Sequence, residues 1–261
     1  MRFVFIIYAI IYLQNLAFAQ TDSIAAKIYI LGTIHKGNNQ FGFKDLVKEL
    51  EKLSPDIILW EQSVPFKRVL GLRTANFLRI WHPGIEQLAL QIYTGKKATC
   101  EVMPYDTTIL NRKAYRKTIQ QNWQKVFDLL SSKEKSKSDS IGLAAFFHTY
   151  NTYYNDLQNQ SLFEINQSAT VDKMRELYKL EDSIIARQLI QYSGDSVLNR
   201  WYLNERSFWE ARNSYMAAQI ERIASASPRK KIVVLTGLAH KYILEDKLNN
   251  KIGIRLMKLS E

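Results

Sequence analysis

The chain has 261 residues, a formal net charge of +11 and a single cysteine, Cys100. One cysteine excludes an intramolecular disulfide, and its place in an apolar run indicates a buried, inert thiol. The basic residues are scattered and form no basic-aromatic module, which argues against a nucleic-acid binder. A solvated basic surface explains the charge best, with peripheral contact to an anionic envelope surface as the alternative.

Residues 1–19 have the pattern of a secretory signal peptide. Arg2 precedes an apolar run from Phe3 to Leu13, and Ala17-Phe18-Ala19 forms a small-x-small cleavage site. The run is shorter than the ~20 residues that a membrane span needs, so we favour cleavage before Gln20 over an N-terminal anchor. The exported chain, periplasmic or secreted, then spans residues 20–261, enough for one α/β domain.

The first hundred residues alternate between predicted strands and helices. An apolar, β-branched run over 28–31 predicts a buried strand, a 3,4-spaced apolar pattern predicts a helix over 43–53, and residues 56–60 form a second apolar run. A strand-helix-strand unit of this length implies a parallel pair. Further predicted elements are a mainly helical segment over 64–81, a helix over 85–93 and a third strand over 99–105.

From residue 107 to about 200 the sequence becomes polar and rich in Lys, Gln, Asn and Tyr. We expect a helical insert covering the sheet edge, with helices at about 111–130, 141–157 and 170–192 and a solvated linker over 131–140. Tyr150, Tyr153 and Tyr154 either line a substrate groove or pack beneath this insert, and packing is favoured.

The last sixty residues predict a helix over 205–224, a strand over 231–236, a short helix and an edge strand over 252–259. The first of these helices carries the apolar stripe Phe208, Tyr215, Met216, Ile220 and Ile223. Arg212 lies on this stripe, where a charge is costly unless it is paired or functional.

Two Gly-x-x-His segments follow two of the predicted strands. They place His35 and His240, two of only four histidines, at the same offset from Gly32 and Gly237. Glu61 and Asp106 follow two further predicted strands, the second and the third in the chain. In a parallel sheet these strand ends share one edge, where α/β proteins bind ligands. The sequence therefore predicts an α/β fold with a mostly parallel sheet, flanking helices and a polar site at the carboxyl edge.

The residue types at this site allow two kinds of chemistry. A histidine near its ordinary pKa is a general base that Glu61 would orient, while Arg212 binds a carboxylate or an oxyanion. Alternatively, His35, Glu61 and His240 are three ligands of a catalytic metal with an open water position. The glycines let the backbone turn sharply and a ligand approach. The sequence has no Gly-x-Ser-x-Gly elbow, His-Glu-x-x-His helix or phosphate-binding loop.

The ordered motifs resemble the TraB/PrgY/GumN and Tiki family, which shares a superfamily with erythromycin esterases and ChaN-type haem-binding proteins. The motifs are Gly32-Thr33-Ile34-His35, a strand ending on Glu61, Arg212-Asn213-x-x-Met216-Ala217-x-x-Ile220, and Gly237-Leu238-Ala239-His240 followed by Leu244. The helix containing Glu86 and the strand ending at Asp106 resemble features of its bacterial members.

The resemblance implies a hydrolytic site with two sets of residues. The catalytic set is His35, Glu61, Arg212 and His240, and the substrate-binding set is Gly32, Glu86, Asp106 and Gly237. Superfamily members are described as metal-dependent peptidases, metal-independent esterases with a His base, or haem-binding proteins. We therefore expect an exported hydrolase of a peptide or ester bond in a peptide or small molecule, with Mn, Co or Zn as the candidate ions. A haem- or peptide-binding protein without catalysis is the alternative.

Overall fold

A computed structural model describes residues 25–67, 84–109, 112–132, 134–193 and 197–259. Within them a five-stranded sheet has the order β3-β2-β4-β1-β5, and all of its strand pairs are parallel. The strands are β1 (Ala26–Thr33), β2 (Ile57–Trp60), β3 (Glu101–Pro104), β4 (Lys231–Gly237) and β5 (Ile254–Met257). The predicted α/β class with a parallel central sheet is confirmed.

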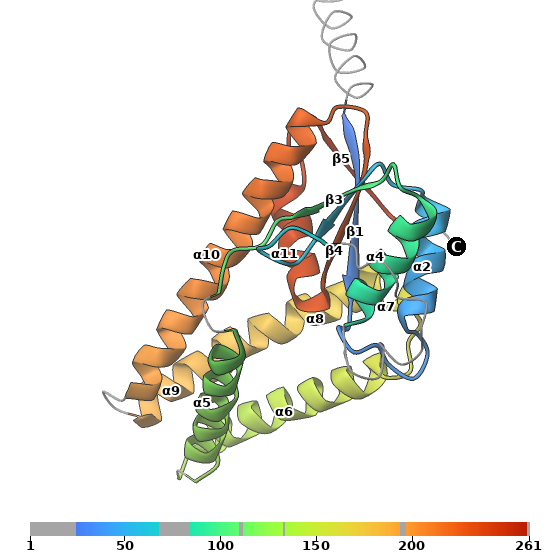
Figure 1. Cartoon of the computed structure of the whole chain (residues 1–261). Coiled ribbons are helices and arrows are strands. Elements are labelled where there is room, and N and C mark those ends of the chain that lie inside the picture. Colours follow the sequence, from blue (N-terminus) through green and yellow to red (C-terminus); the bar gives the residue numbers. More distant parts are fainter. Residues whose placement is uncertain (1–24, 68–83, 110–111, 133, 194–196, 260–261) are drawn as a thin grey trace, which may run out of the picture.

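Helices cover both faces of this sheet (Figure 1). On one face lie α2 (Phe43–Leu53) and α4 (Ile85–Lys96), and on the other α10 (Val197–Ala226) and α11 (Leu238–Leu248). Neighbouring residues of β4 show the two layers, because Val233 belongs to the first core and Val234 to the second. A parallel sheet buried on both faces requires such near-continuous apolar strands.

The segment between β3 and β4 is mainly helical. Before α10 it contains α5 (Arg112–Ser132), α6 (Lys137–Leu157), α7 (Leu162–Ile165), α8 (Ser168–Leu180), the π-helix η1 (Glu181–Ala186) and α9 (Arg187–Ser193). Helices α5, α6, α8 and α9 lie beyond the carboxyl ends of the strands (Figure 1). Val126 of α5 and Phe146 of α6 share a core cluster with Leu235 of the sheet, so the helices of this region and the sheet have one continuous core.

The predicted linker over 131–140 is wrong for most of its length. Residues 131–132 end α5, and Ser136 caps α6 by accepting a hydrogen bond from the Asp139 backbone N–H at 3.1 Å. Asp139 itself is only 3% exposed because Ser136, Tyr192 and Arg187 hold its carboxylate. A run of Ser, Lys and Asp resembles a solvated segment, but its Ser and Asp are also typical helix-capping residues.

Other details differ from the sequence prediction. Tyr215 is 45% exposed, because it lies about 100° around α10 from the buried Met216. Residues 64–67 are not helical, while 68–83 and the predicted signal peptide lie outside the described residues.

Cys100 is buried as expected, and burial raises the pKa of its thiol to about 11. In the part of the chain described, each helix is too short or too polar to cross a membrane.

Candidate functional site

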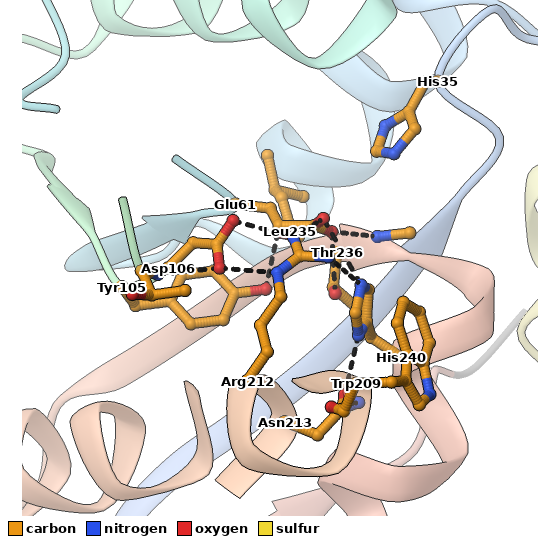
Figure 2. Close-up of polar contacts among 12 residues, drawn as sticks. His35, Glu61, Tyr105, Asp106, Trp209, Arg212, Asn213, Leu235, Thr236 and His240 are labelled. Carbon is orange, nitrogen blue, oxygen red and sulfur yellow. Dashed lines mark hydrogen bonds and ion pairs between the residues drawn. The ribbon is translucent and has the colours of Figure 1, made fainter. Parts of the chain in front are cut away.

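The polar residues predicted at the carboxyl edge do come together there. Glu61 follows β2 directly, Asp106 lies two residues beyond β3, and His240 is in the first turn of α11. Arg212 enters from α10 and lies between them (Figure 2). A cavity of about 580 Å³ opens above this group between the strand ends and helices α5, α6, α8 and α10. His35, Glu61, Arg212 and His240 all line it, whereas Asp106 does not and lies on the side of the Arg212 guanidinium away from His240 (Figure 2).

Arg212 forms the centre of a buried hydrogen-bond network. Its Nε and Nη2 bind the two oxygens of Asp106 at 2.9 and 2.7 Å, its Nη2 also binds Glu61 Oε1 at 2.8 Å, and its Nη1 lies 3.1 Å from His240 Nε2. The side chain of Asp106 is fully buried, and those of Arg212 and Glu61 are each 10% exposed. The charge on the α10 stripe is therefore paired with two carboxylates, which offsets the cost of its burial.

Glu61 is held in the ionised form. Its Oε2 accepts hydrogen bonds from the Gly237 N–H at 2.6 Å and the Thr236 hydroxyl at 3.1 Å. Burial opposes ionisation, but His240, His35, Arg212 and the Gly237 N–H together outweigh it and lower the pKa of Glu61 to about 2. Glu61 is thus a fixed negative charge that positions Arg212. The sequence predicted that Glu61 orients His35, but the structure shows no hydrogen bond between these two side chains.

His240 is held as a neutral imidazole. It is 4% exposed, and burial lowers its pKa to about 4. Its Nδ1 lies 2.7 Å from Asn213 Oδ1, while Asn213 Nδ2 donates to the Trp209 carbonyl oxygen at 2.7 Å. This arrangement places the His240 proton on Nδ1, so that Nε2 accepts from Arg212. The Trp209 ring stacks on the imidazole with centroids 4.2 Å apart (Figure 2).

His35 stands apart from this network and has a different partner (Figure 2). Its Nδ1 lies 2.7 Å from Oε1 of Glu86, a residue in the first turn of α4. The hydroxyl of Thr33 also donates a hydrogen bond to that oxygen. The hydrogen bond to Glu86 is the main reason that the pKa of His35 is raised above 6.5. His35 is half exposed and lines the cavity, and its Nε2 lies near Gly237, another residue of the cavity wall. An ionised carboxylate at Nδ1 fixes the tautomer in which Nε2 is basic.

The two predicted glycines have different surroundings. A Cβ on Gly237 would lie 3.3 Å from His35 Nε2 and 3.5 Å from Glu61 Oε2, so both groups converge on this backbone. A Cβ on Gly32 would instead lie 2.9 Å from Leu238 Cδ1 and close to Asn166 Oδ1. The Gly32 N–H donates to that amide at 2.7 Å. Gly32 therefore packs under α11 and does not line the cavity.

The first turn of α11 adds backbone donors to the site. Gly237 is its N-cap, and residues 237–240 all line the cavity. The N–H groups of the first helical residues have no partner within the helix, and the helix dipole favours negative charge there. The site thus has a base, a fixed guanidinium and backbone donors around one space.

The predicted metal ligands do not fit a metal site. Within the described residues, no group of three or more His, Cys, Asp or Glu side chains is arranged to hold a metal ion. Both oxygens of Glu61 are engaged, and the guanidinium of Arg212 donates to Glu61 Oε1 and to His240 Nε2, two atoms that lie 3.5 Å apart. His35 directs one nitrogen to Glu86 instead. The cation among these groups is therefore supplied by the chain itself.

Sequence reasoning missed the roles of three residues. Glu86 was expected to contact substrate, but the structure pairs it with His35. Asn213 and Trp209 were assigned no role, although both contact His240. The sequence did contain a signal for Asn213, because this residue falls at helical spacing with Trp209 and Met216 on the apolar stripe. In the structure it is fully buried. An amide on a buried stripe indicates a specific hydrogen-bond partner.

Together these features define a parallel α/β protein with a cavity site at the carboxyl edge of its sheet, containing a carboxylate-bound histidine and a buried guanidinium. Compared with protein-family models, curated proteins and solved structures, the chain matches none of them. Its functional assignment therefore depends on the chemistry of the site.

Proposed function

We propose that the chain is an exported hydrolase of the TraB/PrgY/GumN and Tiki type that cleaves an ester or peptide bond, with His35 as a general base acting without a metal. The observation that carries this proposal is the orientation of His35, whose Nδ1 binds Glu86 while its Nε2 points toward Gly237 in the cavity wall. A base oriented by a carboxylate is the arrangement that activates water or a nucleophile in many hydrolases. The signal-peptide pattern over 1–19 supports export.

The reaction uses groups that the site already holds. His35 Nε2 takes a proton from a water molecule, whose oxygen bonds to the carbonyl carbon of the substrate. The carbonyl π electrons move to its oxygen, and this oxyanion is stabilised by Arg212 and the backbone donors of α11. When the oxyanion collapses, the carbon–oxygen or carbon–nitrogen bond breaks and the leaving group takes the proton from His35.

Arg212 retains one donor for this task. A guanidinium has five N–H groups. Within the described residues, four of them bond Asp106, Glu61 and His240, which leaves one N–H of Nη1. Since Asp106 and Glu61 fix the plane of the guanidinium, this donor is positioned before substrate arrives. Glu61 and His240 act by holding Arg212 in place.

Hydrolysis of 4-nitrophenyl esters and of a peptide set, with and without chelator, tests the proposal. We expect His35→Ala to lose about 10²–10⁴-fold in kcat, a typical contribution of general-base catalysis, and to stay folded by circular dichroism. The control is His148→Ala, an exposed histidine on α6 away from the cavity. Retained activity in His35→Ala, or loss of activity with chelator, would contradict the proposal. Haemin binding without turnover would support a binding protein instead.

The pH dependence provides a second test. Activity should rise as His35 loses its proton, with a midpoint above 6.5 because Glu86 raises the pKa of His35. In Glu86→Gln this midpoint should move to lower pH, since a neutral amide no longer favours the imidazolium. An unchanged midpoint would mean that His35 is not the base.

A further inference from the structure

A second cavity of about 440 Å³ adjoins the site cavity. The two cavities share part of their lining, formed by Ile119, Gln120, Tyr154, Glu205 and Trp209. Trp209 joins them physically, because its ring stacks on His240 at 4.2 Å and lies parallel to the Tyr178 ring at 6.2 Å. The second cavity is therefore an extension of the site into the helices of the middle region.

The walls of this extension are mainly aromatic. Trp123 and Phe127 of α5 line it together with Phe146 and Tyr150 of α6. Tyr150 is 37% exposed, so the aromatic groups are not packed into a closed core. A volume of this size lies within the range of about 300–1,000 Å³ that holds small-molecule ligands, which are typically bound by apolar walls with few polar groups.

Glu181 is an acidic group in the lining of the extension whose carboxyl has no hydrogen bond within the described residues. It is the first residue of the π-helix η1, and its side chain is 15% exposed. Arg206 lies 3.8 Å away but binds Asp182 more closely, at 2.7 Å, and within the described residues no hydrogen bond reaches the Glu181 carboxyl. Burial raises the pKa of this carboxyl to about 7, so its neutral form can donate a hydrogen bond. Irregular π turns of this kind occur frequently at functional sites.

We propose that the second cavity is a distal subsite that binds a bulky, mainly apolar ring system of the substrate. Glu181 forms a hydrogen bond with a polar substituent on that ring system. This inference rests on the proposed hydrolytic function and deepens it, because it makes the substrate an extended, amphiphilic ester or amide. The scissile carbonyl lies by His35 and Arg212, and the apolar group extends past Trp209 between α5 and α6. Aromatic walls favour a ring, since offset-stacked or edge-to-face ring pairs are more stable than their buried area alone accounts for.

Binding measurements separate this subsite from catalysis. We would titrate 4-phenylbutanamide and butanamide into the wild type and His35→Ala by calorimetry, because neither amide needs turnover to be detected. The phenyl compound should bind both proteins at least tenfold more tightly than butanamide. Equal affinities of the two amides would overturn the inference.

Two variants place the binding in the second cavity. Trp123→Ala removes one wall, and Gln124→Trp fills the cavity from an exposed lining position without removing a packed side chain. Each should weaken the phenyl compound at least tenfold, whereas Tyr215→Ala, an exposed aromatic away from the cavity, should leave it unchanged. Unchanged affinity in both cavity variants would refute the assignment.

A matched ester pair completes the test. If the proposed hydrolysis occurs, 4-nitrophenyl 4-phenylbutyrate should have a higher kcat/KM than 4-nitrophenyl butyrate, and Trp123→Ala should abolish the difference. Tight binding of the phenyl amide without turnover of any ester would reject the hydrolase and keep the apolar subsite. Turnover of both esters with equal kcat/KM would keep the hydrolase and reject the subsite.

Discussion

Replacing Arg212 by Met removes the cation that lies between two buried carboxylates. Met has a similar length and no charge, so the variant tests the charge with little change in packing volume. The variant loses three strong hydrogen bonds that Arg212 donates, two to Asp106 and one to Glu61. The negative charges of Glu61 and Asp106 then repel each other without a cation between them. In the wild type, favourable interactions outweigh the effect of burial and lower the pKa of Glu61. In the variant, the effect of burial should outweigh the interactions that remain and raise this pKa.

The structure gives two estimates of the cost. Removing one partner of a buried ion pair typically costs about 3–5 kcal/mol, because the other charge stays buried. Independently, lowering the pKa of Glu61 from 4.5 to about 2 corresponds to about 3 kcal/mol of stabilisation, of which Arg212 contributes part. We therefore expect the free energy of unfolding at pH 7 to fall by about 3–5 kcal/mol.

The pH dependence has a definite sign. In the wild type the contribution of Glu61 is present above pH 4.5 and is lost as the pH falls through about 2. In Arg212→Met, acid should instead stabilise the native state, because protonation of Glu61 relieves its repulsion with the neighbouring carboxylate. The difference between wild type and variant should therefore shrink between pH 7 and pH 4.

Urea denaturation followed by circular dichroism at both pH values measures these free energies. The matched control is Arg222→Met, which removes an exposed arginine from the same helix and should cost less than about 0.5 kcal/mol. Arg212→Lys keeps the charge but loses the two-pronged contact, so it should lie between wild type and Met. If Arg212→Met is as stable as Arg222→Met, or if its deficit does not shrink in acid, the network is not ionised as described.

Two further predictions concern the neighbours of this network. Asn213→Ala should cost about 1–3 kcal/mol, because it leaves the buried Nδ1–H of His240 without an acceptor, and an unchanged free energy of unfolding in urea denaturation would contradict it. Gly237→Ala should stay folded at its φ of −60° but lose activity, since the methyl group lies 3.3 Å from His35 Nε2. Gly142→Ala, with no neighbour within 4 Å, should keep full activity and gain up to about 1 kcal/mol, and equal activity of the two would refute the close approach.

The sequence predicted much of the sheet and its functional edge. The apolar runs over 28–31, 57–60 and 231–236 are strands in the structure, and the first strand-helix-strand unit predicted that its two strands run in the same direction. They do, but the predicted pairing of β1 with β2 is wrong, because β4 lies between them and pairs with both. That parallel arrangement is why Glu61 and His240 could be expected to lie together before any coordinates. Arg212 was also detectable, because a charge on an apolar helix stripe requires a partner.

Other features depended on the tertiary structure. The bond between His35 and Glu86 joins residues 51 positions apart, and nothing in either local pattern favours Glu86 over Glu61 as the partner. The second cavity likewise arises from the packing of α5, α6, η1 and α10, whose aromatic residues resemble ordinary core residues in the sequence.

The difference has a physical cause. Apolar periodicity and helix capping act over a few residues, so the sequence by itself determined the elements and the edge to which their ends point. Whether a given carboxylate can bond a given imidazole depends on how precisely segments far apart in the chain are positioned relative to each other. Only the packed tertiary structure sets those distances, and they make Glu61 the partner of Arg212 and Glu86 the partner of His35.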